Sequence, residues 1–145
     1  MIFNTLSQFA DQFGALNVFR YITFRTGGAM ITALVVSFIF GPAIIHWLRR
    51  TQKGGQPIRE DGPESHILTK AGTPTMGGVL ILLALTVSTF LWADLTNGYI
   101  WAALGVTLGF GAIGFIDDYM KVSRRDSHGL PGKLKFSLEV IIAVI

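Results

Sequence analysis

Three long stretches of this chain contain no charged side chain and consist mostly of apolar residues. They are bounded by Arg25 and Arg49, by Lys70 and Asp94, and by Asp94 and Asp117. At a rise of about 1.5 Å per residue, a helix formed from any of them could cross a hydrocarbon core of about 30 Å. The pattern predicts an all-α, polytopic membrane protein with complete spans at about 27–48, 76–93 and 99–116.

A further apolar run begins near residue 134 and continues to the last residue, Ile145. Protein chains rarely end inside a membrane helix, so we expect 1–145 to be the front part of one longer integral membrane domain. The composition favours this over buried helices of a large soluble protein, because 50% of the residues are hydrophobic and only 14% are charged. Soluble domains usually have about 25% charged residues. The absence of Cys excludes a disulfide scaffold, a Cys-ligated zinc site and a thiol nucleophile.

The basic residues predict the orientation in the membrane. Ten of the twelve lie in two loops, 49–75 and 117–133, or at the start of the fourth apolar run: Arg49, Arg50, Lys53, Arg59, Lys70, Lys121, Arg124, Arg125, Lys133 and Lys135. Since basic loops stay in the cytoplasm, we expect the tail 1–26 and the turn 94–98 to face outward. Membrane topology thus accounts for the net charge of +3, and no nucleic-acid surface is needed to explain it.

The first cytoplasmic loop is rich in turn-forming residues and ends in glycines that lead into the second span. Lys70 and Thr75 precede Gly77 at this point. Backbone N–H groups at the start of a helix, with a nearby hydroxyl and a Lys, can bind a phosphate group. A solvated connector that happens to contain glycine is an equally good interpretation of the same residues.

The second loop begins with two adjacent carboxylates, Asp117 and Asp118, at the end of the third span. Two such groups at a membrane boundary repel each other, and a divalent cation relieves that cost. Mg²⁺ prefers a few carboxylate oxygens together with substrate phosphates and water. If the helix continues, Asp117 and Lys121 share one face and Asp118 points about 100° away. An ordinary Asp–Lys pair at a polar helix end is the alternative.

The segment from Gly109 to Gly114 matches the G-x-G-x-x-G dinucleotide fingerprint. That fingerprint has meaning only between a strand and a helix, whereas here it lies within an uncharged span. We therefore interpret these glycines as sites of close helix packing.

Both loops are predicted on the same side of the membrane, so together they offer a cationic pocket and a candidate metal site. This combination suits phosphoryl-type transfer from a soluble phosphorylated donor to a membrane-borne phosphate acceptor. An intramembrane aspartyl protease would need its acids on separate helices. A non-enzymatic subunit of a membrane complex would need neither acid.

The same residues resemble the phospho-N-acetylmuramoyl-pentapeptide transferases, the bacterial family that makes the first lipid intermediate of peptidoglycan. Three motifs carry the resemblance, namely Asp61-Gly-Pro-Glu-Ser-His66, Lys70-x-Gly-Thr-Pro-Thr-Met-Gly-Gly78 and Gly111-x-x-Gly-Phe-x-Asp-Asp-x-x-Lys121. Sister enzymes that use UDP-N-acetylglucosamine share the Asp-Asp pair but usually lack the first motif. The muramoyl enzymes are therefore the closer match.

The resemblance implies ten transmembrane helices in the bacterial inner membrane, an outward N-terminus and a cytoplasmic active site. It implies transfer of phospho-MurNAc-pentapeptide from UDP-MurNAc-pentapeptide to undecaprenyl phosphate, with Mg²⁺ as cofactor and release of UMP. It leaves open whether the protein forms a homodimer. The residues that it assigns are the catalytic Asp117, Asp118 and Lys70, the metal ligand Asp117 or Asp118, and the substrate-binding Lys121, Lys135, Thr75, Gly77 and His66.

The chain departs from the family pattern by ending before the family's later Asn/Asp-rich loop, its further metal-binding Asp and its His-rich loop. We therefore predict that these 145 residues alone are inactive. Lys133, two residues before Lys135, is the alternative match to the family's lysine at this position.

Overall fold

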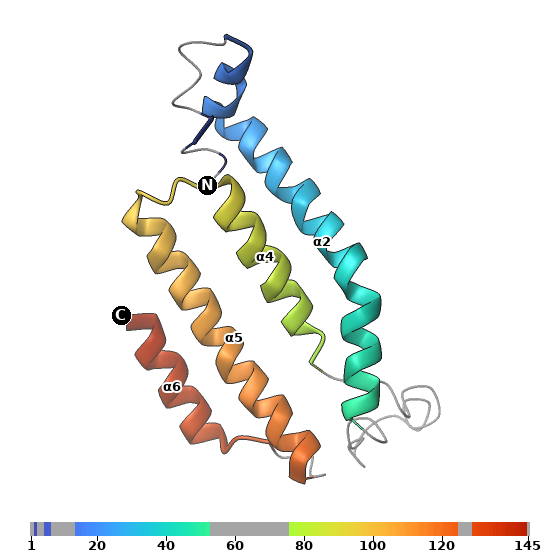
Figure 1. Cartoon of the computed structure of the whole chain (residues 1–145). Helices are drawn as coiled ribbons and strands as arrows, with labels where there is room; N and C mark the ends of the chain where they lie inside the picture. Colours follow the sequence, from blue (N-terminus) through green and yellow to red (C-terminus); the bar gives the residue numbers. More distant parts are fainter. Residues whose placement is uncertain (1, 3–4, 7–13, 53–75, 125–128, 145) are drawn as a thin grey trace.

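The computed structural model describes residues 2, 5–6, 14–52, 76–124 and 129–144, and every regular element in these ranges is helical (Figure 1). The elements, in chain order, are the 3₁₀ helix η1 (Gly14–Arg20) and the α-helices α2 (Ile22–Thr51), α4 (Gly78–Trp92), α5 (Gly98–Arg124) and α6 (Gly132–Val144). The expected all-α class is confirmed. His66, Lys70 and Thr75 lie outside the described residues.

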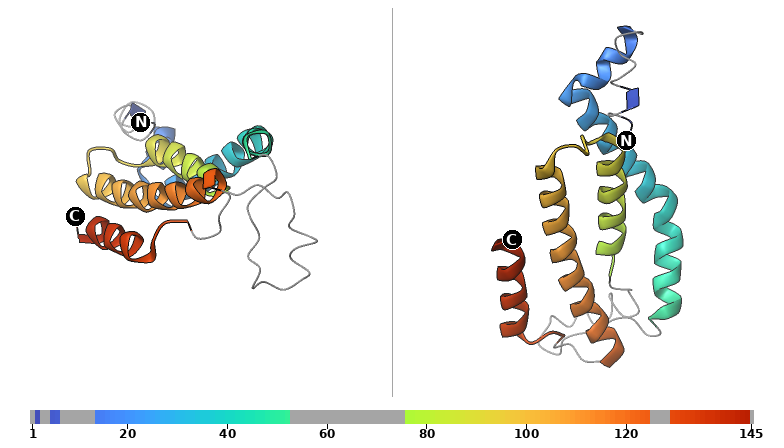
Figure 2. Two further views of the ribbon diagram at one scale, coloured as in Figure 1. Left: turned by 90° about the horizontal axis from the view of Figure 1, so that it is seen from below. Right: turned by 60° about the vertical axis from the view of Figure 1, so that its left-hand side comes forward.

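The four α-helices lie side by side in chain order, and each packs against the next (Figures 1 and 2). Successive helices run in opposite directions. As a result, the C-terminal ends of α2 and α5 and the N-terminal ends of α4 and α6 gather at one end of the bundle. The ends of the helices that flank 53–75 and 125–128 are therefore close to the same plane.

The apolar side chains of α2 and α5 are mostly exposed rather than buried. In the most apolar part of each helix, only 11% of the residues are buried. Large side chains such as Phe38 and Met30 are 74% and 68% exposed. Water disfavours so large an apolar surface, whereas lipid accommodates it. Both helices are long and apolar enough to cross a membrane, and α4 is a shorter apolar helix.

Small residues allow the helices to approach one another closely. A Cβ at Gly109 would lie 3.0 Å from Ile142 of α6, and a Cβ at Gly111 would overlap Leu82 of α4. Two glycines of the G-x-G-x-x-G segment thus face neighbouring helices, as their interpretation as packing sites requires, whereas a Cβ at Gly114 would meet nothing within 4 Å. At the C-terminal end of α4, the indole of Trp92 lies against Gly28 and donates a hydrogen bond to Thr32 at 2.9 Å.

Helices α2 and α5 extend beyond the segments predicted from the apolar runs, whereas α4 lies just within its predicted segment of 76–93. Helix α2 begins before residue 27 and ends after residue 48, and α5 continues well past residue 116. The uncharged runs mark only the part of each helix that suits lipid, whereas backbone hydrogen bonding continues through polar residues as well. The extension of α5 carries the Asp-Asp pair on a helix rather than in a loop.

Candidate functional site

The site lies where α5 ends and α6 begins. Leu104, Ile113 and Asp117 are the buried residues of α5. Because Ile113 and Asp117 are four residues apart, they lie on the same face of the helix. Asp117 therefore continues the packed face of α5 toward α6, although it is a carboxylate.

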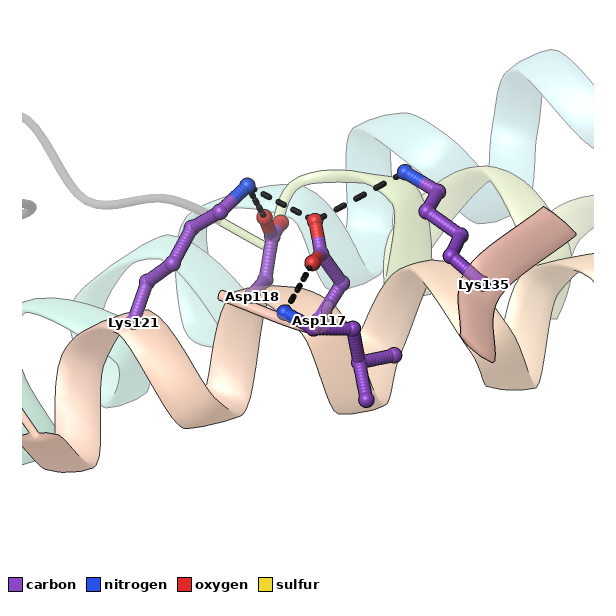
Figure 3. A network of polar contacts seen from close by, with 5 residues as sticks. Asp117, Asp118, Lys121 and Lys135 are labelled. Atoms are coloured by element: carbon purple, nitrogen blue, oxygen red, sulfur yellow. Dashed lines mark hydrogen bonds and ion pairs between the residues drawn. The ribbon is translucent and has the colours of Figure 1, made fainter. Parts of the chain in front are cut away.

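Three partners from two elements and their connection surround the Asp117 carboxylate (Figure 3). Lys121 Nζ donates a hydrogen bond to Asp117 Oδ2 at 2.7 Å, and Lys135 Nζ of α6 lies 3.7 Å from the same oxygen. The backbone N–H of Leu130 donates to Oδ1 at 2.8 Å. The Asp117 side chain is only 9% exposed, so these contacts replace the water that a carboxylate normally binds.

The Asp118 carboxylate lies beside that of Asp117 in Figure 3, and the Asp118 side chain is more exposed, at 30%. Its Oδ1 lies 3.8 Å from Lys121 Nζ, so Lys121 lies between the two carboxylates. Asp117, Asp118, Lys121 and Lys135 form a group that we call the charge cluster. Because it holds two carboxylates and two lysine ammonium groups, the charge cluster has no formal net charge at neutral pH.

The environment keeps Asp117 ionised. This residue lies beyond the uncharged run of α5, which ends at Ile116. The hydrogen bond from Lys121 holds the pKa of the Asp117 carboxyl below its ordinary value, and the Leu130 N–H and the charge of Lys135 act in the same direction. Burial opposes this lowering of the pKa, but it does not overcome the hydrogen bonds and the charges.

The structure separates the two lysines at the start of α6. Lys135 lies near Asp117, whereas Lys133 is exposed. The contact thus involves Lys135, the lysine that the family resemblance implies. The pairing of Asp117 with Lys121 is expected both for a functional site and for an ordinary ion pair at a polar helix end. The contacts from Lys135 and Leu130 go beyond an ordinary pair within one helix turn.

The backbone at Gly129 and Leu130 is part of the site, and the sequence reasoning missed it. Gly129 has a φ of 59°, and Leu130 supplies the N–H that binds Asp117. A Gly-Leu-Pro-Gly sequence between two helices signals a turn. The sequence therefore predicts a turn here, but it does not predict that the backbone of this turn contacts Asp117.

Gly77 lies at the start of α4, at the same end of the bundle as the charge cluster. It is exposed, and a Cβ at this position would meet nothing within 4 Å. Next to it, Met76 is buried and has a φ of 72°, which is unusual for a residue other than glycine. The start of α4 is therefore held in a specific backbone conformation.

The described residues contain no group of three or more His, Cys, Asp or Glu side chains placed to hold a metal ion. Within them, the charge cluster offers two adjacent carboxylates, of which Asp118 is the more exposed. Mg²⁺ is commonly bound by one or two carboxylates together with substrate phosphates and water. The donor set therefore fits such an ion as a partial site.

The exposed apolar helices and the charge cluster at one end of their bundle define a helical membrane protein with a compact polar site. Comparison with known proteins is more specific. Residues 70–82 match the phospho-N-acetylmuramoyl-pentapeptide-transferase signature 1. This signature includes the first turn of α4 and Gly77.

Two curated relatives are similar over all 145 residues. Identity is 59% to the phospho-N-acetylmuramoyl-pentapeptide-transferase of Granulibacter bethesdensis and 55% to that of Maricaulis maris. The chain spans 40% of the length of each relative. The resemblance to this transferase family is therefore confirmed across the whole chain.

Proposed function

We propose that the chain is part of an enzyme that transfers phospho-MurNAc-pentapeptide from UDP-MurNAc-pentapeptide to undecaprenyl phosphate. The products are the first lipid intermediate of peptidoglycan synthesis and UMP. The family signature at residues 70–82 and the high identity to two named transferases support this activity. The structural observation that carries the proposal is the charge cluster at the end of α5.

The charge cluster suits a reaction between two phosphate-bearing molecules. Lys121 and Lys135 supply fixed positive charge next to a nearly buried carboxylate. In a site from which water is partly excluded, such charge stabilises phosphate oxygens more than it does in bulk water. Lys70, Thr75, Gly77 and His66 would complete the substrate contacts from the first loop and the start of α4.

Either Asp117 or Asp118 would hold Mg²⁺, as the family resemblance implies. When bound, the ion reduces the negative charge of the donor diphosphate and of the departing UMP. Asp117 holds Lys121 and Lys135 at the site through its Oδ2. Asp118 presents the more exposed carboxylate of the pair. The two acids therefore have different roles even though they are adjacent in the sequence.

The topology that we propose has complete spans at about 27–48, 76–93 and 99–116, formed by α2, α4 and the uncharged part of α5, with α6 as the start of a fourth. The N-terminal tail faces outward, and the charge cluster faces the cytoplasm of the bacterial inner membrane. The positive-inside pattern of the two basic loops supports this orientation. The helix ends that flank those loops lie at the same end of the bundle, as the orientation requires (Figure 1).

The test is UMP release by the full-length protein in detergent with undecaprenyl phosphate and UDP-MurNAc-pentapeptide, with and without Mg²⁺. Metal-dependent release supports the proposed activity. Release only with UDP-N-acetylglucosamine as donor would place the protein with the sister enzymes. No release with either donor would favour a non-enzymatic membrane subunit and refute the proposal.

A further inference from the structure

The connection between α5 and α6 contacts the charge cluster through its backbone. Gly129 has a φ of 59°, in the left-handed region that glycine adopts without steric cost. The next residue, Leu130, directs its N–H at Asp117 Oδ1 over a distance of 2.8 Å. The conformation of the chain at Gly129 therefore decides whether the carboxylate receives this hydrogen bond.

Gly129 also lies too close to the Asp117–Lys121 pair to carry a side chain. A Cβ at this position would overlap Asp117 Oδ1 and would lie 2.7 Å from Lys121 Cε. Cβ atoms do not approach other heavy atoms this closely, so any other residue must displace the carboxylate, the lysine or the backbone. Asp117 is held by three partners and is nearly buried, so it cannot move without losing some of them.

Gly132, the first residue of α6, provides the contrast. A Cβ there would meet nothing within 4 Å. The close approach is therefore a property of Gly129 that Gly132 does not share.

We propose that Gly129 is a positioning residue for the transfer reaction. Its left-handed backbone and missing side chain allow the connection to hold Asp117 and Lys121 in the arrangement that faces the substrate phosphates. This inference rests on the proposed function, because it assigns the charge cluster to that reaction. Gly129 has no side chain and contributes no reacting group.

The experiment compares Gly129→Ala, Gly129→Asn and the matched control Gly132→Ala in the full-length protein. Asn tolerates a positive φ better than Ala does, but it still introduces a Cβ. Both kcat and the KM for UDP-MurNAc-pentapeptide are measured from UMP release, with each rate divided by the amount of monodisperse folded protein. The thermal midpoint of each variant is measured in the same detergent.

We expect both Gly129 variants to lose kcat by about tenfold or more, because a misplacement of about 1 Å in an active site can cost about 100-fold in rate. Gly132→Ala should keep the kcat of the unsubstituted protein. A normal kcat in Gly129→Asn, or equal losses in the variants at positions 129 and 132, would overturn the role of Gly129 alone. Failure of both Gly129 variants to fold would also overturn it, since the glycine would then serve the fold. Absence of UMP release from the unsubstituted protein would refute the proposed function itself.

Discussion

Removing Lys121 should destabilise the protein more than removing Lys135, although both lysines face the same oxygen of Asp117. Lys121 Nζ lies 2.7 Å from Oδ2 and its side chain is 19% exposed, whereas Lys135 Nζ lies 3.7 Å away and its side chain is 41% exposed. A hydrogen bond to a charged group contributes about 1.5–3 kcal/mol, and a solvent-exposed ion pair contributes about 0–1 kcal/mol. Lys121→Gln should therefore cost about 2 kcal/mol, and Lys135→Gln less than about 1 kcal/mol.

The assay is denaturation of the full-length protein in detergent, with the two single variants measured side by side. The double variant Lys121→Gln, Asp117→Asn is the decisive control. Lys121→Gln leaves a nearly buried carboxylate without its closest cation, and neutralising that carboxylate should recover part of the lost stability. Equal destabilisation by the two single variants would refute the reasoning from distance and exposure. A double variant no more stable than Lys121→Gln would show that the unpaired charge is not the cause.

Three further predictions concern the two acids, the packing of α5 on α4 and the activity of the 145-residue chain. Asp117→Asn and Asp118→Asn should each lower turnover in the full-length protein by orders of magnitude while most of the protein still folds. UMP release measures the turnover, and size-exclusion chromatography measures the folded fraction. Near-normal turnover would show that these residues are not part of the site. Gly111→Ala should destabilise by about 1–3 kcal/mol because its Cβ overlaps the side chain of Leu82, whereas Gly105→Ala should be close to neutral because its Cβ meets nothing within 4 Å. Similar denaturation midpoints for these two variants would contradict the packing of α5 on α4. The purified 145-residue chain should release no UMP from UDP-MurNAc-pentapeptide, and release above a no-protein blank would disprove this.

The helices of this protein could be predicted well because lipid imposes a simple rule. Every backbone polar group in a hydrocarbon core must find its partner within the protein, so long uncharged runs become helices. The positions of α2, α4 and α5 follow from this rule, but their ends do not. The sequence places the charge of Asp117 at the end of an apolar run, whereas the backbone of α5 continues helically to Arg124.

The candidate site was predictable only in its residue types. Helical spacing alone indicates that Asp117 and Lys121 share a face, and the structure shows them in contact. Which of two nearby lysines approaches from α6 depends on how α6 turns against α5, and no local pattern contains that information. The sequence likewise does not indicate that Gly129, in its left-handed conformation, lies against the carboxylate of Asp117.

The sequence alone determined the helical membrane class, the family resemblance and the adjacent acids, because these depend on local composition and on the order of residues. Only the tertiary structure decided that Asp117 is nearly buried and Asp118 more exposed, and that Lys135 rather than Lys133 approaches Asp117. It alone also placed the indole of Trp92 against Gly28 and Thr32. The physical reason is that burial and ion pairing depend on distances between elements, and only the packing of one helix on another sets those distances.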